Sequence, residues 1–419
     1  MQQRKVLRSL AQVAVGALFV AGIAGCGAVG GTSSAKGGTV CIATDFPVSG
    51  TDATAGLPAQ NGAVLAAQQN KTLHGGYTLQ IKTFDDAVNG AHNATQGATN
   101  VGKMATDSCI LAMVGPFNSG VAGAEIPIAT QAGLAMISPA NTNPGLTLQQ
   151  YAQAYGFDFA KMHPAGQPEA YFRIPANDVV QGKEDAQIAL DAGAKKAYVV
   201  DDSESYGKGL ADFFTQYFTA GGGATAGRDS ITGANTTQLA ALVSKMKATT
   251  PDVVFYGGVT SGGGAALRQA MSSGGMSSVP MVGGDGIADD PSFTQIAGAS
   301  AEGTTGTVAA PDLLGLNSNP AANKFVADYK AAFNTDPIAY SVNSYDAAMI
   351  EIAAINKVID SGKAPDRASV LANIAGTSYD GITGHISFDQ YGDNAGAKVF
   401  SIYTVKNGQW TYVKTVPVT

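Results

Sequence analysis

Residues 110–143 read ILAMVGPFNSGVAGAEIPIATQAGLAMISPANTN. An apolar run, residues 110–114, opens this segment, and a second apolar run, residues 135–138, comes near its end. A Gly-Pro turn and a longer Ala-rich stretch lie between them. Short, nearly continuous apolar runs predict strands that are covered on both faces. A longer stretch between two such strands is typical of a parallel sheet flanked by helices.

The same alternation continues in both directions along the chain. Apolar runs predict strands at residues 39–44, 79–84, 110–114, 135–138, 197–200, 253–256 and 281–282. Amphipathic, Ala-rich stretches predict helices at residues 62–70, 95–105, 183–192, 209–220, 237–248, 264–272, 321–333 and 345–361. The tail from residue 384 is strand-like. The series of strands and helices occurs twice, from about residue 39 to 173 and from 177 to 309, which predicts an α/β fold with two doubly wound parallel-sheet lobes. Ligands of such sheets bind beyond the carboxyl ends of the strands, in a cleft between the lobes.

Composition excludes several classes of protein. Of the 419 residues, 45% are hydrophobic and 14% are charged, which excludes a disordered chain. The net charge of −7 argues against a nucleic-acid partner, because such a partner needs a basic face. Three Cys and four His show no metal-binding spacing, so we expect no metal and no cofactor.

The first residues resemble the leader of a bacterial lipoprotein. Arg4, Lys5 and Arg8 precede an apolar run at 13–23, which is too short for a permanent membrane helix. Residues 23–26, Ile-Ala-Gly-Cys, resemble a lipobox, in which the peptide is cut before a lipid-modified Cys, here Cys26. An ordinary secretory signal with a chance Cys is the alternative.

The lipoprotein interpretation divides the N-terminal region into two segments. Residues 1–25 are then a signal peptide, and residues 26–38, rich in Gly and Ser, are a flexible tether. The folded part would lie outside the cytoplasm, and the lipid would attach it to the membrane.

Cys41 and Cys109 both lie at the beginnings of predicted strands. Export implies an oxidising compartment, where two thiols tend to pair, so a Cys41–Cys109 disulfide is expected. Two buried free thiols acting as small hydrophobic side chains are the alternative.

Small polar loops follow the predicted strands. Ser119 and Thr142 offer hydroxyls near helix N-termini, where free N–H groups favour an anion. Asp285 offers a carboxylate among glycines, which let a ligand approach the backbone. Together these residues suit a small zwitterion, whose carboxylate would meet the hydroxyls and whose ammonium would meet Asp285. Each residue alone would be an ordinary helix cap or turn residue.

Eight motifs, taken in order, resemble the Leu/Ile/Val-binding family of type I periplasmic binding proteins. They are PVSG at 47–50, HGG at 74–76, FDD at 84–86, VGP at 114–116, MISPA at 136–140, YFR at 171–173, SYGKGLA at 205–211 and LRQA at 267–270. The resemblance implies two lobes joined by three crossovers, near residues 173–177, 309–312 and 388–390. It assigns residues 39–174 with 310–388 to the N-terminal lobe and residues 175–309 with 389–419 to the C-terminal lobe.

The resemblance also implies the residues that bind the ligand. Ser119, Ala140 and Thr142 would hold the carboxylate end of an amino acid, Asp285 would receive its ammonium, and Tyr206 and Tyr340 would be aromatic walls. The complete expected set is Asn118, Ser119, Ala140, Thr142, Tyr206, Val259, Asp285 and Tyr340.

Three features depart from the family pattern. Ala55 and Val259 stand where aromatic residues are expected, which widens the side-chain part of the pocket. Residues 149–167 are an insertion relative to short members. The ligand is therefore a branched-chain amino acid or a larger, aromatic or otherwise substituted amino acid or amide.

The resemblance implies a solute-binding protein of an ABC importer with no enzymatic activity. Its partners would be a small-molecule ligand, ABC permease subunits and, through the lipid, the membrane. Closure of the lobes would require ligand contacts from both of them. A membrane-anchored sensor that signals to a receptor has the same fold and pocket, and is the alternative. A hydrolase is disfavoured because the sequence shows no nucleophile–base pair or nucleophile elbow.

Two further groups of residues carry no predicted chemistry. We expect all four histidines, at positions 74, 92, 163 and 385, to be surface or loop residues. We expect Asp85 and Asp86 to be turn residues rather than an acid–base pair.

Overall fold

The structure is a computed structural model that describes residues 37–313 and 315–418. The predicted leader, the lipid-modified Cys26 and most of the tether lie outside the described residues. Within the described part of the chain, no helix is long and apolar enough to cross a membrane.

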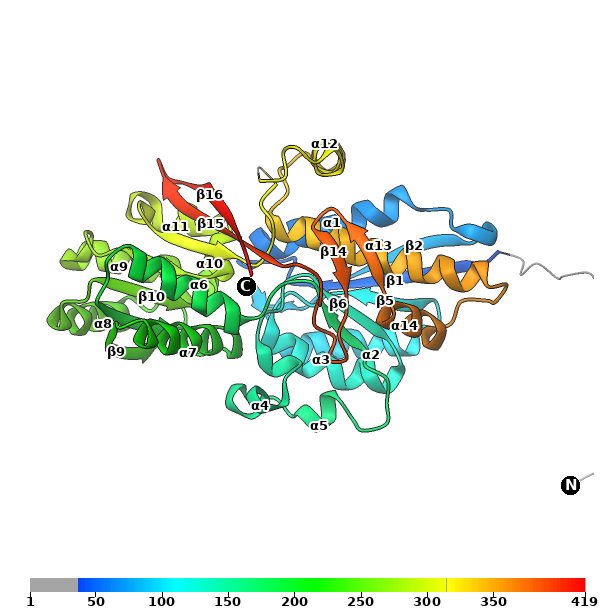
Figure 1. Ribbon diagram of the computed structural model, residues 1–419, viewed down its shortest axis with the longest axis horizontal. Coiled ribbons are helices and arrows are strands. Elements are labelled where there is room, and N and C mark those ends of the chain that lie inside the picture. Colours follow the sequence, from blue (N-terminus) through cyan, green and yellow to red (C-terminus); the bar gives the residue numbers. More distant parts are fainter. Residues whose placement is uncertain (1–36, 314, 419) are drawn as a thin grey trace, which may run out of the picture. The chain divides into compact units, whose positions relative to one another are not determined.

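The first sheet has five parallel strands in the order β2-β1-β5-β6-β7 (Figure 1). Their bounds are β1 (Thr39–Phe46), β2 (Thr78–Asp85), β5 (Ile110–Val114), β6 (Ala135–Ser138) and β7 (Tyr171–Arg173). The helices of this part are α1 (Ala53–Gln69), α2 (Ala94–Thr106), α3 (Ser119–Ala132), α12 (Pro320–Phe333), α13 (Ala339–Asp360) and α14 (Arg367–Ala375). We call this sheet and these helices the first lobe.

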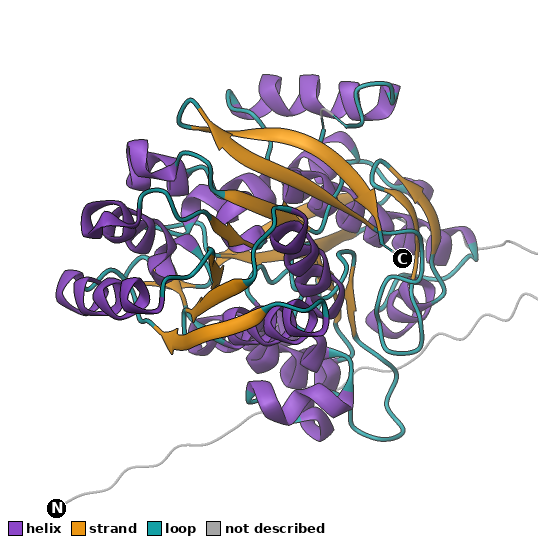
Figure 2. Cartoon of the chain, turned by 60° about the vertical axis from the view of Figure 1, so that its left-hand side comes forward, coloured by secondary structure: helices purple, strands orange, loops and turns teal. Residues whose placement is uncertain are grey.

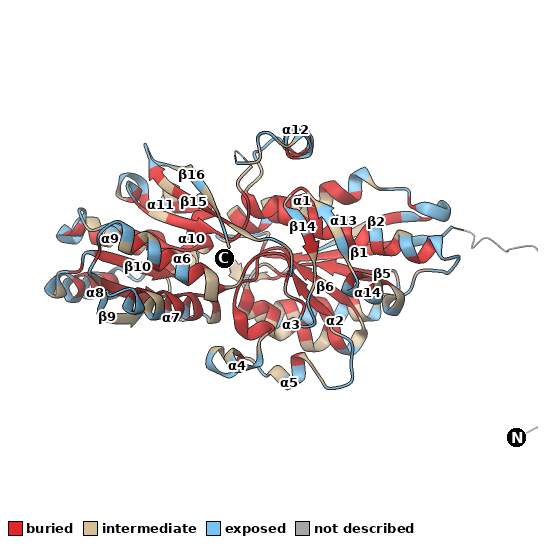
Figure 3. Ribbon diagram, viewed as in Figure 1, coloured by how far each residue is buried: buried red, intermediate tan, exposed pale blue. Residues whose placement is uncertain are grey.

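Alternate residues of β1 explain why helices cover both faces of the sheet. Val40 and Ile42 pack into the cluster that contains α1, α13 and α14, whereas Cys41 and Ala43 pack into the cluster of α2 and α3. Successive strand residues point to opposite faces, so an unbroken apolar strand needs a cover on each side. Figure 2 shows helices on both sides of the strands, and Figure 3 shows that β1, β5 and β6 are almost wholly buried.

The second sheet has seven strands in the order β16-β15-β12-β11-β10-β8-β9. Their bounds are β8 (Lys196–Asp201), β9 (Ala224–Ser230), β10 (Val253–Gly257), β11 (Met281–Gly283), β12 (Thr305–Val308), β15 (Val399–Lys406) and β16 (Gln409–Pro417). Its helices are α6 (Asp178–Asp191), α7 (Ser205–Ala220), α8 (Thr236–Thr249), α9 (Ala265–Met271), α10 (Asp285–Ala288) and α11 (Ser292–Ala297). This is the second lobe. It is mixed rather than fully parallel, because β15 and β16 add to its edge in antiparallel pairing.

The remaining short elements join or decorate the lobes. They are β3 (Ala87–Val88), β4 (Ala91–His92), α4 (Gln149–Ala152), α5 (Phe159–Met162), β13 (Ser378–Gly381) and β14 (Gly384–Ser387).

The chain passes between the sheets after β7, after β12 and before β15, and Arg173 ties the first and third of these passages together. Its guanidinium is fully buried and its Nε donates to Asp393 Oδ1 at 2.6 Å. The two terminal nitrogens donate to the carbonyl oxygen of Asn143 and to Thr147 Oγ1, both at 2.7 Å. A buried charge needs this degree of pairing, so these segments are held in register.

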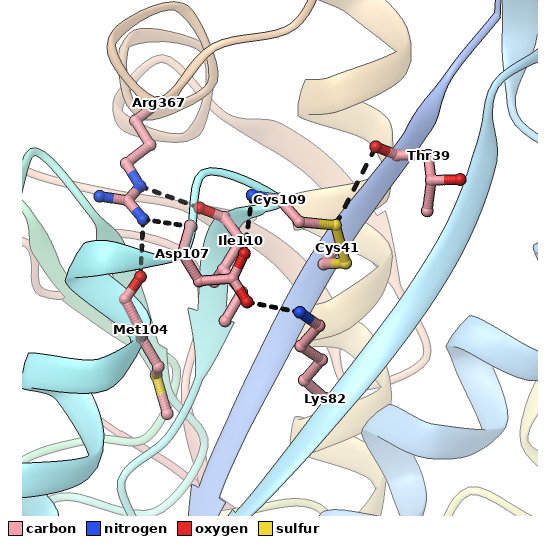
Figure 4. The surroundings of a disulfide bond; sticks show 8 residues. All are labelled: Thr39, Cys41, Lys82, Met104, Asp107, Cys109, Ile110 and Arg367. Carbon is pink, nitrogen blue, oxygen red and sulfur yellow. Dashed lines mark hydrogen bonds and ion pairs between the residues drawn. A yellow bond between two sulfur atoms is a disulfide. The ribbon is translucent and has the colours of Figure 1, made fainter. Parts of the chain in front are cut away.

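The predicted disulfide is present. Cys41 in β1 and Cys109, just before β5, are bonded, and their Cα atoms are 5.0 Å apart (Figure 4). Nearby, Asp107 accepts a hydrogen bond from Lys82, and Arg367 at the start of α14 donates to the carbonyl oxygen of Ile110 at 2.9 Å. The disulfide therefore lies wholly within the first lobe.

Candidate ligand-binding cleft

The loops after β5 and β6 form the first-lobe side of the candidate site. Gly115 has a φ of +131°, and a Cβ there would come within 2.5 Å of the carbonyl oxygen of Asp45, so only glycine fits. Ser138 Oγ donates to the carbonyl oxygen of Pro116 at 2.8 Å and accepts from the N–H of Asn141 at 2.9 Å. These contacts hold the two loops side by side.

Four of the predicted residues lie on these joined loops, and their polar atoms have long hydrogen bonds or no partner among the described residues. Ser119 Oγ accepts from the N–H of Asn143 at 3.4 Å. Thr142 Oγ1 and Asn118 Oδ1 are buried and have no hydrogen-bond partner within residues 37–313 and 315–418. Ala140 is buried, and its N–H donates to Ser138 Oγ at 3.3 Å. Because Ser119 also begins α3, the free N–H groups of that helix start here.

The second-lobe side is built around Asp285, the first residue of α10. Its Oδ1 accepts from Gln181 Nε2 at 2.7 Å and from the Tyr206 hydroxyl at 2.9 Å. The Tyr206 hydroxyl in turn accepts from the N–H of Gly286 at 3.1 Å. Burial raises the pKa of Asp285 above its ordinary value, against the opposing effect of the hydrogen bonds from Gln181 and Tyr206.

Residues of both lobes line one small cavity. They are Pro47, Asp52, Ala55, Phe117 and Asn118 from the first lobe and Val259, Asp285, Gly286 and Asp290 from the second. Of the predicted site residues, Asn118, Val259 and Asp285 are therefore brought together on one surface. Ala55 and Val259, which stand where the family pattern has aromatic residues, are both on this surface.

The other five predicted residues do not line the cavity. Tyr206 is bonded to Asp285, and Ser119 follows Asn118. Tyr340 makes an edge contact with Phe117, with ring centres 5.9 Å apart. Its buried hydroxyl has no partner in the described part of the chain. Ala140 and Thr142 lie on the loop after β6, which is hydrogen-bonded to the loop that carries Asn118 and Ser119.

Sequence reasoning missed several lining residues, of which Asp52 and Asp290 carry charge. Asp52 Oδ2 accepts from the ring Nδ1 of His92 at 2.7 Å. Asp290 accepts from Thr54 Oγ1 at 2.8 Å, from the N–H of Ser292 at 2.9 Å and from Ser292 Oγ at 2.7 Å. The only available signal was the Asp-Asp-Pro-Ser sequence at 289–292, which is typical of a helix start and not of a binding site.

Two predictions about polar residues need correction. His92 is not a surface or loop residue, since it belongs to β4 and its side chain is only 14% exposed; the His163 side chain is only 11% exposed, but this residue lies in a loop as expected. Burial opposes the protonation of His92, but Asp52 outweighs that effect and the pKa of His92 is raised. Asp85 caps a turn as predicted, because its Oδ1 accepts from the N–H groups of Val48 and Ala87.

Asp86 does not behave as a turn residue. It is fully buried, and within residues 37–313 and 315–418 its carboxylate oxygens have no partner. Burial raises its pKa well above the ordinary value, and the nearby Asp45 acts in the same direction. Its burial beside Asp45, Asp85 and Asp52 could not be inferred from a Phe-Asp-Asp motif alone.

The lobes touch across the cavity, so this is a closed arrangement. Thr54 of α1 donates to Asp290, and Asn143 Nδ2 donates to the carbonyl oxygen of Ser205 at 2.7 Å. The N–H groups of Ala339 and Tyr340 donate to the two carboxylate oxygens of Asp289, at 2.9 and 3.1 Å.

The 149–167 insertion adds a second zone of contact between the lobes. The ring of Tyr151 meets Phe213 of α7 edge to face, with centres 5.4 Å apart. Tyr155 meets the same Phe213 ring at 6.4 Å.

A larger groove, of about 990 Å³, lies between α11, α12 and the β15–β16 hairpin. None of the predicted site residues lines it. Among the described residues, no group of three or more His, Cys, Asp or Glu side chains is placed to hold a metal ion.

Two α/β lobes with three connections and a small cavity between them are the architecture of a protein that binds a small solute between its lobes. The sequence pattern of the periplasmic binding protein family matches residues 39–409, and the chain belongs to that family. Its members are non-enzymatic, extracytoplasmic solute-binding proteins that work with ABC permeases.

Individual relatives agree with this assignment. The chain is 28% identical to the Leu/Ile/Val-binding protein BraC3 of Rhizobium johnstonii, over 88% of this chain and 92% of that protein. The leucine-binding protein LivK of Thermotoga maritima, which has a crystal structure, is 26% identical to this chain in sequence. The match covers 90% of this chain and 98% of LivK, with a TM-score of 0.76. A Rhodopseudomonas palustris solute-binding protein in complex with benzoate shares the fold at 21% identity, with a TM-score of 0.73 and coverage of 91% and 97%.

Proposed function

We propose that the protein is the lipid-anchored, solute-binding component of an ABC importer and that it binds an amino acid or a related small zwitterion or amide by lobe closure. One observation carries the proposal: the buried Asp285 carboxylate and the unpartnered Asn118 Oδ1 line the same cavity from opposite lobes. A ligand that touches both is bound more tightly by the closed state, and this difference drives closure.

The polar groups assign an orientation to the ligand. The ammonium lies against Asp285, whose Oδ1 is already positioned by Gln181 and Tyr206. The carboxylate lies against Ser119, Thr142 and the first N–H groups of α3, where the helix dipole favours a negative charge.

The side chain of the ligand lies among the apolar lining residues Pro47, Ala55, Phe117 and Val259. BraC3 is a Leu/Ile/Val-binding protein and LivK is a leucine-binding protein, which supports a branched-chain amino acid as the ligand. The benzoate complex of the Rhodopseudomonas palustris protein shows that the fold also accepts an aromatic ring. The proposed site also includes Tyr340, whose ring packs against Phe117, and Ala140, which lies on the same loop as Thr142.

Lipid attachment at Cys26 and the lobe boundaries given above are part of the same proposal. The disulfide supports an oxidising compartment, and the membership of the strands in two sheets supports the boundaries. Replacement of Cys26 by Ala should move the protein from the membrane fraction to the soluble fraction of its host cell. Unchanged membrane association would contradict the anchor.

A thermal-shift panel tests the ligand class. The protein is stripped of bound solute by unfolding in guanidinium without reductant and is then refolded. It is then mixed with amino acids, amino-acid amides, benzoates and sugars. We expect a rise in the unfolding temperature with at least one α-amino acid or amide, because only the closed state binds it. Stabilisation by benzoates or sugars alone would refute the zwitterion assignment.

A further inference from the structure

Two buried carboxylates line the cavity with neutral partners only. Asp285 is held by Gln181 and Tyr206, and Asp290 by Thr54 and Ser292. Asp285 is 8% and Asp290 is 6% exposed. In the part of the chain that the structure describes, neither forms an ion pair within 4 Å.

The third acid of the cavity, Asp52, is in a different position. It is paired with His92, so its charge has a partner within the protein. Asn118 Oδ1 is a further acceptor on the cavity wall that receives no hydrogen bond from the described residues. The charged side chains on the wall are therefore all acidic, and two of the three have no cationic partner among the described residues.

Charge complementarity favours one class of ligand over another. A buried carboxylate without a cation is costly. An amino acid with a neutral side chain brings one ammonium, which Asp285 takes, and one carboxylate, which the first-lobe hydroxyls and helix N-terminus take. Asp290 would stay buried without a cation when the lobes close.

We propose that the site selects α-amino acids whose side chain carries a second positive charge, with Asp285 binding the α-ammonium and Asp290 binding the side-chain cation. This inference rests on the proposed function, since it uses the same cavity and orientation. It narrows the ligand from amino acids in general to diamino and other basic amino acids.

Asp290 has a second role that must be separated from charge recognition. It accepts from Thr54 across the cleft, and it caps α11 through Ser292. A change at Asp290 could therefore weaken closure for every ligand. Thr54→Val is the matched control, because it removes the cross-lobe hydrogen bond and leaves the carboxylate in place.

Calorimetric titration with L-ornithine and L-norleucine provides the test, because their side chains have the same length and differ in a terminal ammonium or methyl. We expect the parent protein to bind ornithine at least about tenfold more tightly than norleucine. Asp290→Asn should abolish most of that difference by weakening ornithine alone. Thr54→Val should weaken both ligands by the same factor and leave the ratio unchanged.

Each result has a separate meaning. Norleucine or leucine binding as tightly as ornithine in the parent protein would overturn this inference and leave the amino-acid function standing. Equal loss of both ligands in Asp290→Asn would also overturn it, and would assign Asp290 to the cross-lobe contact alone. Binding of no amino acid would refute the proposed function itself. The ratio of ornithine affinity to norleucine affinity is measured in the parent protein. The inference can therefore be tested even if the Asp290→Asn variant does not fold.

Discussion

Asp285 is the residue in which burial, charge and hydrogen bonding converge. Its carboxyl is enclosed by Gln181, Tyr206 and the cavity, and its pKa is raised because burial penalises the charged form. A bound ammonium restores the preference for the charged form. Ligand binding therefore releases a proton from Asp285 wherever that carboxyl is protonated in the empty protein, and affinity falls as the pH falls through its raised pKa.

Asp285→Asn should weaken amino-acid binding at least about thirtyfold, because a buried ammonium would lose its charged partner. The measurement is calorimetric titration with the best ligand of the panel. Asp380→Asn is the control, since the Asp380 side chain is 91% exposed and belongs to the β13–β14 hairpin. Equal affinity of the Asp285 variant and the parent would remove Asp285 from the site.

At the scale of elements, the 149–167 insertion contributes more than extra surface. It leaves the first lobe after β6, and Tyr151 and Tyr155 reach Phe213 in α7 of the second lobe. Aromatic pairs of this kind contribute about 0.5–1.5 kcal/mol beyond their burial. Since these aromatic contacts join the lobes, we expect them to stabilise the closed state, as the bound ligand also does.

Tyr151→Ala should therefore weaken every bound ligand by about two- to tenfold. Phe159→Ala is the matched control, because Phe159 lies in the same insertion but packs on the first lobe and His163. Titration of both variants with one ligand, together with X-ray scattering of the empty proteins, measures affinity and opening. If the two variants behave alike, the insertion does not act between the lobes.

The elements were predictable from the sequence where one local signal dominated. Residues 110–114 and 135–138 form strands with the predicted bounds, because a buried parallel strand is an apolar run. α1 begins at Ala53, well before the predicted residue 62, since Gly56 and Pro58 conceal the helical pattern. β9 escaped prediction because it is an edge strand that contains Gly227 and three charged or hydroxyl residues in succession.

The site was predictable only in part. Asn118, Val259 and Asp285 were reached through strand-end loops and the family resemblance, and all three line the cavity. Phe117 and Asp290 were not, because their place on the cavity depends on how one lobe meets the other. No local sequence pattern encodes the contact between the two lobes.

For the whole molecule, buried carboxyls determine the pH dependence of stability. Burial raises the pKa of Asp45 from 3.8 to about 7, and those of Asp202 and Asp346 to about 6. The folded state therefore holds protons that the unfolded chain releases above pH 4. Their contribution to the unfolding free energy is lost as the pH rises from about 4 to 7. The raised pKa of His92 acts in the same direction.

The protein should consequently unfold at a higher denaturant concentration at pH 5 than at pH 8. Urea unfolding followed by circular dichroism at the two pH values measures this difference. Asp45→Asn should reduce it, since an amide does not titrate. A parent protein that is more stable at pH 8 than at pH 5 would contradict this expectation.

Asn143 connects the proposed ligand site to the crossovers and to the other lobe, so a change at this residue would alter ligand binding and lobe closure together. Its carbonyl oxygen accepts from Arg173 at the crossovers, its N–H reaches Ser119, and its side chain reaches Ser205 of the other lobe. The lining residues can be exchanged to retune cargo preference without disturbing this junction. An engineered biosensor built on the scaffold would therefore diversify positions 55, 117 and 259 and retain Asn143, so that new chemistry at the wall still produces the same closure of the lobes.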